Sequence, residues 1–500
     1  MPVRSTPSAP CDGIPLLLHN LYYVKLDVLK PNTLLFLMLW SASALTLSGQ
    51  DGKKAASPAV VHPAFGTSWT GDGIKVTFLT RKQQFSLAET ATLDRDIHSP
   101  KSVNIHPSGR KYYVNSLEGA KTVVYDFATN GKIKVIKHSF SDAEKGLWAP
   151  SSGLFTFGHS YSSPDTFSGK PVESTFSHGG RYLWVPYYRR SYDINAQEPS
   201  AMAVIDTETD EIIRMFETGP LPKMVATAPD GTRLAVTHWG NNTVGLMDIS
   251  SDQPADWHYI ASLVVDYQLK LNLSLTVPVD RDVNSGYCLR GTVFTPDNHY
   301  LLVGCMGGGG GIAVIDLTTN RYLGRAMGVM PNLRHLIIKN GYLYGSINKT
   351  GHIQRIELQD FLDQVSVLDG DKKKTVTVSN WVNCKIPAGA RTIEASPDGH
   401  FLFAACNFSS CLAVVDAREM TLLGTIPADS FPVGLDISRD GRYVFTTSQA
   451  RNIAGNCVDI FQVEYSYAQI IRNPVDWLPP MPGIFGSGAR AVSEWVLSPR

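Results

Sequence analysis

Short apolar runs of strand length, separated by turn residues, recur along most of the chain. The clearest example is Ala390–Ala428, where the runs ARTIEA, HFLFAA, CLAVVDA and TLLGTI follow one another. The residues SPDG, beginning at Ser396, separate the first two runs. They favour a tight turn because Pro fixes φ, Asp hydrogen-bonds to nearby backbone and Gly accepts a positive φ. A second turn begins at Asp416. The segment therefore predicts four antiparallel strands and shows no helical period.

The same unit is repeated along the chain. Besides SPDG, its first turn reads HPSGRKYYV at His106, SHGGRYLWV at Ser177, APDGTRLAV at Ala228, TPDNHYLLV at Thr295, a shortened KNGYLYG at Lys339 and SRDGRYVFT at Ser438. An aspartate recurs where the third strand ends, and we expect it to stabilise the next turn. These aspartates are Asp126, Asp206, Asp248, Asp316 and Asp416. Since one such sheet cannot bury both of its faces, we predict an all-β fold, a seven-bladed β-propeller of four-stranded antiparallel blades.

The repeat, a PDG turn before an apolar strand and then a strand of the form AVID, resembles the YVTN-type β-propeller repeats of secreted and periplasmic bacterial proteins. The resemblance covers roughly Ile74 to Tyr465. It implies the propeller fold. It does not imply one activity, since this repeat family includes lactonases, surface-layer proteins and binding proteins.

The chain divides into four predicted segments. Residues 1–49 are expected to be an N-terminal extension with a signal peptide, because Lys25 and Lys30 precede the apolar run LLFLMLW and the small residues Ser41–Ala44. Residues 50–73 read as a linker, 74–465 as the propeller and 466–500 as a non-repeating tail. The protein is therefore expected to be exported, to the periplasm or to the cell surface and medium, with no transmembrane segment after signal cleavage.

The last repeat supplies only three strands, FPVGLDIS, RYVFTTS and CVDIFQVEY. A lone alternating strand, Ile74–Thr80, precedes the first repeat. We predict that this N-terminal strand completes the last blade and closes the ring, because a propeller without it would expose a sheet edge.

Basic residues recur six positions before the first turn of each unit. In blade order this position carries Lys101, Val172, Lys223, Arg290, Arg334, Arg391 and Val433, with Arg334 allowing for its shorter turn. The position lies near the entry of the innermost strand, so five cations are expected around one mouth of the central channel. They predict a site for a carboxylate, phosphate or sulfate. The alternative is that each cation pairs with a carboxylate of a neighbouring blade, such as Glu173.

The second strands end at the same face of the predicted ring. Their last positions carry Ser116, Tyr187, His238, Cys305, Cys406 and Ser448. Of these, His238 is a candidate ligand-binding residue, and the alternative is a hydrogen-bonded structural histidine. An insertion between Asp256 and Gly286 contains LKLNLSLTV, which reads as another strand.

Composition limits the possible partners. The 45 basic and 45 acidic residues balance, so no nucleic-acid partner is expected. If the chain is exported, Cys288 and Cys305 are predicted to form a disulfide, and Cys406 and Cys411 are a second candidate pair. The sequence indicates no cofactor and no metal site.

Three functions remain open at this point. The first is a binding propeller that presents the basic mouth to a small anionic ligand, a glycan or a protein partner. The second is a lactonase-like hydrolase that would use His238, Arg290, Arg391 and Glu173 on the same face, although no catalytic residue is assigned by a motif. The third is an interaction scaffold of the cell envelope.

Overall fold

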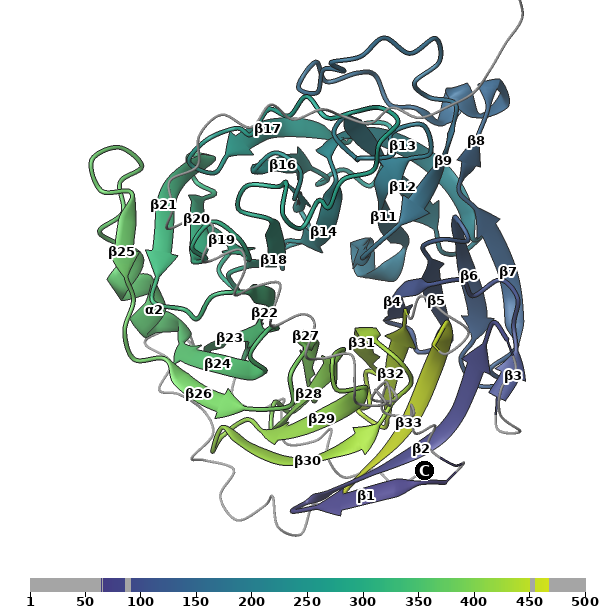
Figure 1. Ribbon diagram of the computed structural model, residues 1–500, viewed down its shortest axis with the longest axis vertical. Helices are drawn as coiled ribbons and strands as arrows, with labels where there is room; N and C mark the ends of the chain where they lie inside the picture. The colour runs from purple at the N-terminus through teal and green to yellow at the C-terminus, as the bar shows by residue number, and fades with distance from the viewer. Residues whose placement is uncertain (1–63, 65, 86–90, 450–454, 467–500) are drawn as a thin grey trace, which may run out of the picture. The chain divides into compact units, whose positions relative to one another are not determined.

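The computed structural model describes residues 64, 66–85, 91–449 and 455–466. Seven antiparallel sheets follow one another around a common centre, and the first strand of each repeat lies nearest that centre (Figure 1). The predicted all-β, seven-bladed propeller of four-stranded blades is confirmed. The segments 1–49 and 467–500, which carry the predicted signal peptide and most of the tail, lie outside the described residues.

The strands that each repeat supplies follow one another in chain order from the centre outward. The innermost strands are β4 (Pro100–Ile105), β10 (Thr175–Ser177), β14 (Pro222–Thr227), β18 (Leu289–Phe294), β22 (Leu333–Lys339), β27 (Ala390–Ala395) and β31 (Pro432–Ile437). The second strands are β5 (Lys111–Ser116), β11 (Tyr182–Arg190), β15 (Arg233–His238), β19 (Tyr300–Cys305), β23 (Tyr342–Ile347), β28 (Phe401–Cys406) and β32 (Tyr443–Ser448).

The outer half of each blade follows the same order. The third strands are β6 (Lys121–Asp126), β12 (Pro199–Asp206), β16 (Thr243–Asp248), β20 (Ile312–Asp316), β24 (His352–Glu357), β29 (Cys411–Asp416) and β33 (Cys457–Tyr465). The fourth strands of the first six blades are β7 (Lys132–Lys137), β13 (Glu211–Pro220), β17 (His258–Val264), β21 (Arg321–Met327), β26 (Val382–Lys385) and β30 (Thr421–Pro427).

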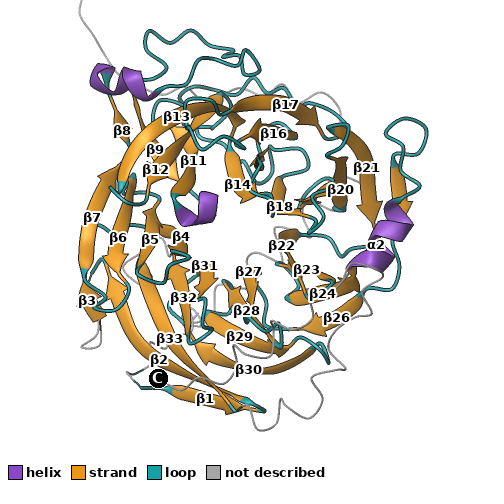
Figure 2. Ribbon diagram, turned by 180° about the vertical axis from the view of Figure 1, so that it is seen from behind, coloured by secondary structure: helices purple, strands orange, loops and turns teal. Residues whose placement is uncertain are grey.

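Additional short elements lie beside this framework. They are β1 (Ser68–Gly71), β3 (Ala91–Leu93), β8 (Ser139–Phe140), β9 (Phe167–Pro171), β25 (Thr375–Thr377), α2 (Leu358–Val365) and the 3-10 turns η1 (Asp142–Leu147) and η2 (His178–Gly180). Figure 2 shows α2 at the rim, beside the outer strands of the fifth blade. No helix in the described part of the chain is long and apolar enough to cross a membrane.

The hydrophobic core is divided among the interfaces between blades. Within the described residues, seven clusters of buried apolar side chains each join two adjacent blades. One of them places Phe445 and Val458 of the seventh blade against Val103 and Tyr112 of the first. Strands that are apolar on both faces explain this arrangement, because each blade needs a neighbour on both sides.

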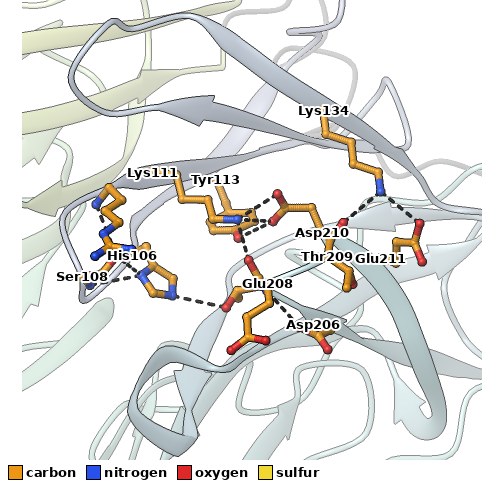
Figure 3. A network of polar contacts seen from close by, with 12 residues as sticks. His106, Ser108, Lys111, Tyr113, Lys134, Asp206, Glu208, Thr209, Asp210 and Glu211 are labelled. Atoms are coloured by element: carbon orange, nitrogen blue, oxygen red, sulfur yellow. Dashed lines mark hydrogen bonds and ion pairs between the residues drawn. The ribbon is translucent and has the colours of Figure 1, made fainter.

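Polar contacts reinforce the interface between the first two blades, at the turn that joins β12 and β13 (Figure 3). Asp206 Oδ1 accepts a hydrogen bond from the Glu208 N–H at 2.9 Å, so its predicted role in the turn is confirmed. From the same turn, the Asp210 carboxylate accepts from Lys111 Nζ at 2.9 Å and from the Tyr113 hydroxyl at 2.6 Å. The turn therefore stabilises both its own blade and the contact with the first blade.

The N-terminal strand β2 (Ile74–Gln83) pairs antiparallel with β33 from Ile74 opposite Tyr465 to Gln83 opposite Cys457. The sheet of the last repeat thus contains β31, β32, β33 and β2 in that order, with β1 paired to the outer side of β2. The sequence did not predict β1, which lies within the expected linker.

A buried ion cluster joins β2 to the seventh blade. Arg81 Nε lies 2.6 Å from Asp459 Oδ1, and Arg81 Nη1 lies 2.8 Å from Asp429 Oδ2. All three side chains are at most 1% exposed. The cluster contrasts with Lys75 and Glu464, an exposed ion pair at 3.1 Å on the same two strands.

We predict that β2 closes the ring and that Arg81 anchors it. Arg81→Met should lower the free energy of unfolding by about 3–5 kcal/mol, because it leaves two buried carboxylates without their cation. It should also promote aggregation by loosening the strand that covers the β33 edge. Chemical denaturation and size-exclusion chromatography measure both effects.

The matched change on the exposed pair, Lys75→Met, should lower the free energy of unfolding by no more than about 1 kcal/mol. Equal stability of the two variants would contradict the anchoring role.

Candidate functional site

The basic positions predicted from the repeat lie at the second residue of innermost strands. Lys101, Lys223, Arg290, Arg334 and Arg391 follow the first residues of β4, β14, β18, β22 and β27. At each of these points the innermost strand carries one more residue than its partner strand, as between Pro222 and Met224 opposite His238 and Thr237. Such a bulge bends the strand and redirects a side chain. The repeat therefore turns the same position of several blades toward the channel.

Four of these five cations line one cavity. Lys101, Lys223, Arg334 and Arg391 contribute to its lining, and its volume is ≈ 650 Å³. We call these four residues and Arg290 the basic mouth. Arg290 adjoins it through Glu173: Arg290 Nη2 lies 2.9 Å from Glu173 Oε1, and Lys101 Nζ lies 3.4 Å from the same oxygen. Glu173 thus connects cations of the fourth and first blades.

The remaining cations lack such a partner. Within the described residues, Lys223, Arg334 and Arg391 form no ion pair with a carboxylate. The buried Nε atoms of Arg334 and Arg391 and the Nζ of Lys101 also have no hydrogen-bond partner there. Leaving a buried charged donor unsatisfied is costly. Of the two alternatives from the sequence, structural pairing describes Lys101 and Arg290, whereas Lys223, Arg334 and Arg391 fit an anion site.

Burial and mutual repulsion act on the acid–base equilibria of the basic mouth. Burial, followed by the nearby Arg290, lowers the pKa of Arg334 to about 10. Burial and the Arg391 charge lower the pKa of Lys101 well below its usual range. Burial alone would raise the pKa of Glu173, but Lys101 and Arg290 outweigh it and hold that carboxyl below its ordinary value. The cations of the basic mouth therefore repel one another, and Asp282 offsets part of this effect by raising the pKa of Lys223, Arg334 and Arg391.

Aromatic rings contribute to the same cavity. Lys223 Nζ lies 4.2 Å from the ring centre of Tyr188 and 5.3 Å from that of Trp239. The Arg334 guanidinium lies 5.9 Å from the Trp239 ring. Cation–π contacts of this kind stabilise a cation without neutralising it. The rings thus contact Lys223 and Arg334 without supplying a counter-charge.

The insertion after the third blade covers part of the cavity and supplies residues that the repeat did not predict. Val279, Asp280, Arg281 and Asp282 line it. Arg281 is buried and donates to the carbonyl oxygens of Ala196 at 2.6 Å and Gly240 at 3.1 Å. The prediction of a strand in LKLNLSLTV is wrong, because residues 269–277 form irregular backbone and bends. The carbonyl oxygens of Leu273 and Ser274 instead accept hydrogen bonds from Gln197 and Asn195 of the second repeat.

His238 lies apart from the basic mouth. Its side chain is fully buried, Nε2 accepts from the Gly219 N–H at 3.0 Å, and Nδ1 contacts Thr243 Oγ1 at 2.8 Å. Burial lowers its pKa to about 3, so the ring is neutral. It does not line the cavity, and both ring nitrogens are satisfied. The hydrogen bonds match the structural alternative for this residue.

The described cysteines are all buried free thiols. The predicted Cys288–Cys305 bridge is not formed; instead, Cys288 Sγ donates to the Ser285 carbonyl oxygen at 2.9 Å. The second candidate pair, Cys406 and Cys411, lies directly opposite across β28 and β29 but is likewise unbonded. No group of three or more metal-ligating side chains occurs within the described ranges.

Comparison with known proteins shows the fold alone. No protein-family model matches the chain, and no curated protein matches it in sequence. Among solved structures, the chain is similar to hydrazine synthase from Kuenenia stuttgartiensis, with a TM-score of 0.52 and 13% identity over 75% of this chain and 99% of that chain. A second similarity is to the β-propeller domain of Cps50 (Swd1) from Myceliophteria thermophila, with a TM-score of 0.49 and 12% identity over 73% and 96%.

Two half-buried carboxyl groups lie farther along the innermost strands. Burial and the neighbouring Asp436 raise the pKa of Glu394 on β27 to about 8. Burial raises the pKa of Asp436 on β31 to about 7, although its Oδ2 accepts from the Ile105 N–H at 2.6 Å. Both groups therefore retain protons in the folded protein at pH values where an exposed carboxyl has lost them.

This pair predicts a stability that falls as pH rises. In the unfolded chain both carboxyls have a pKa of about 4, so between about pH 4 and pH 8 unfolding releases the retained protons. The contribution of the two groups to the free energy of unfolding is therefore full below about pH 4 and is lost as the pH rises through their folded pKa values. At pH 8, Glu394→Gln should raise the free energy of unfolding by roughly 1–3 kcal/mol relative to the wild type. At pH 5 the gain should be smaller. Thermal denaturation at both pH values tests this, with the exposed Glu419→Gln as control. A gain that is equal at the two pH values would exclude the titration.

Proposed function

We propose that this propeller is a binding protein that holds a small anionic ligand at the basic mouth. The supporting observation is the cavity of ≈ 650 Å³ that collects Lys223, Arg334 and Arg391 without an ion-pair partner among the described residues. Cavities of about 300–1,000 Å³ suit small molecules. Guanidinium groups offer paired donors to carboxylate and phosphate oxygens. A bound anion would satisfy the orphaned donors and reduce the repulsion among the cations.

The geometry favours binding over hydrolysis. A lactonase-like reaction through His238 would need its imidazole at the reacting bond, whereas the ring is enclosed and engaged at both nitrogens. The hydrolase hypothesis also used Arg290, Arg391 and Glu173. These residues can equally well bind a ligand without hydrolysing it. Export and membership of the YVTN-type repeat family remain part of the proposal and rest on the sequence of residues 1–49 and on the repeat.

Removing Arg391 should weaken anion binding. We expect Arg391→Gln to reduce the affinity for phosphate or a small carboxylate by roughly 1.5–3 kcal/mol, the range for hydrogen bonds to charged groups. The empty variant should melt at the same temperature or slightly higher, because one repelling charge is gone. Calorimetric titration measures the first effect and thermal shift the second.

Arg439→Gln provides the control. It removes the same charge from the exposed turn at the far end of the innermost strand β31. Its anion affinity should equal that of the wild type. If phosphate, sulfate and acetate all fail to bind the wild type, or if Arg391→Gln unfolds the empty protein, the arginines are structural and the proposed function is rejected.

A further inference from the structure

Two phenylalanines give the cavity an apolar side. Phe408 follows β28, and Phe431 precedes β31; both line the cavity with Arg391. Their ring centres lie 6.2 Å apart, and the Arg391 guanidinium lies 6.0 Å from the Phe431 ring centre. Phe408 is 57% exposed, although large apolar side chains are usually buried. An apolar ring surface thus adjoins one of the unpaired cations.

The backbone conformation at Phe431 is one that disfavours a phenylalanine. In six blades the residue just before the innermost strand has a positive φ: Ser99, Leu221, Cys288, Asn332, Gly389 and Phe431. Small residues, Asn and Gly tolerate this conformation best, and a bulky ring is a genuine outlier there. Leu221 belongs to a buried apolar cluster, whereas Phe431 belongs to none in the described residues. Core packing therefore does not offset the strain at Phe431.

Phe408 is also exceptional among equivalent positions. Two residues after the end of the second strand, the first, third, fourth and fifth blades carry Glu118, Gly240, Gly307 and Lys349. In the second blade, where β11 continues to Arg190, this position is Tyr192, whose ring packs on Tyr161 and does not line the cavity. Among these positions in the described residues, Phe408 is the one that places an aromatic ring in the cavity lining. The Tyr188 and Trp239 rings lie 4.2 and 5.3 Å from Lys223 Nζ, closer than the 6.0 Å between the Arg391 guanidinium and the Phe431 ring. Within the described residues the Phe408 ring has no cation contact and is more than half exposed, so the Phe408–Phe431 pair is the more open ring surface of the cavity.

We infer that the ligand is an aryl acid, with its anionic group on Arg391, Arg334 and Lys223 and its planar ring against Phe408 and Phe431. This inference rests on the proposed function and adds the chemical class of the ligand. A hydrated inorganic ion would use the cations but leave the two rings exposed. An aromatic body would cover them through offset or edge-to-face contacts.

The test compares phenyl phosphate, cyclohexyl phosphate and inorganic phosphate by calorimetric titration of the full chain. Phenyl phosphate should bind wild type at least about tenfold more tightly than phosphate, as expected for one added aromatic contact. Phe408→Ala and Phe431→Asn should abolish this preference by lowering the affinity for phenyl phosphate; Asn suits the positive φ. Arg391→Gln should weaken both ligands. Leu422→Ala, on the outer strand β30, removes an exposed apolar side chain elsewhere and should change neither.

The outcomes separate this inference from the proposed function. If phenyl phosphate and phosphate bind equally and both depend on Arg391, the anion site stands and the aryl preference is rejected. Equal affinities for phenyl and cyclohexyl phosphate would reject the requirement for a planar ring. If none of the three binds, both proposals fall. A phenyl preference that survives in Phe408→Ala and Phe431→Asn would place the ring elsewhere and overturn the assignment.

Discussion

A propeller blade carries apolar side chains on both faces, and only two neighbouring blades can cover them. This constraint explains why the buried clusters lie between blades and why the seventh blade packs on the first through Phe445 and Tyr112. It also brings the starts of the innermost strands together at one end of the channel. There six of the seven repeats supply a positive-φ residue and then a bulge, as at Gly389 and Arg391. Side chains at these positions are adjacent because the ring is closed by packing.

Two groups of buried charges in the same ring have opposite balances. At Arg81 one guanidinium contacts two carboxylates, Asp429 and Asp459, so the cation is fully compensated. At the basic mouth one carboxylate, Glu173, contacts Lys101 and Arg290, and three further cations have no ion pair in the described part of the chain. Asp282 lines the same cavity and opposes the lowering of the pKa of Lys223, Arg334 and Arg391, but among the described residues it forms no ion pair with them. The proposed anion site rests on this difference in pairing between the two groups of charges.

The repeat determined what could be predicted from the sequence. Aligning the turns was enough to place Lys101, Lys223, Arg334 and Arg391 at the same height along the channel axis. Equivalent positions of the repeats in a closed propeller share this height. The alignment contains no information about insertions, so Arg281 and Asp282 were missed. Alternation of apolar residues in LKLNLSLTV suggested a strand, but no sheet edge pairs with it. The alignment also could not predict the hydrogen bonds of His238, because its partners Gly219 and Thr243 lie on neighbouring strands.

The departures from the repeat make the ring asymmetric. The basic position is valine in the second and seventh blades, where Val172 precedes Glu173 and Val433 follows Phe431 by two residues. Negative charge therefore lies on the second blade, apolar rings lie where the sixth and seventh blades meet, and the unpaired cations come from the third, fifth and sixth blades. A small symmetric ion would contact only the unpaired cations and neither the acidic nor the apolar side. The proposed aryl acid, with one charged end and one apolar end, would take a single orientation in such a ring. A ring of identical blades could not select that orientation.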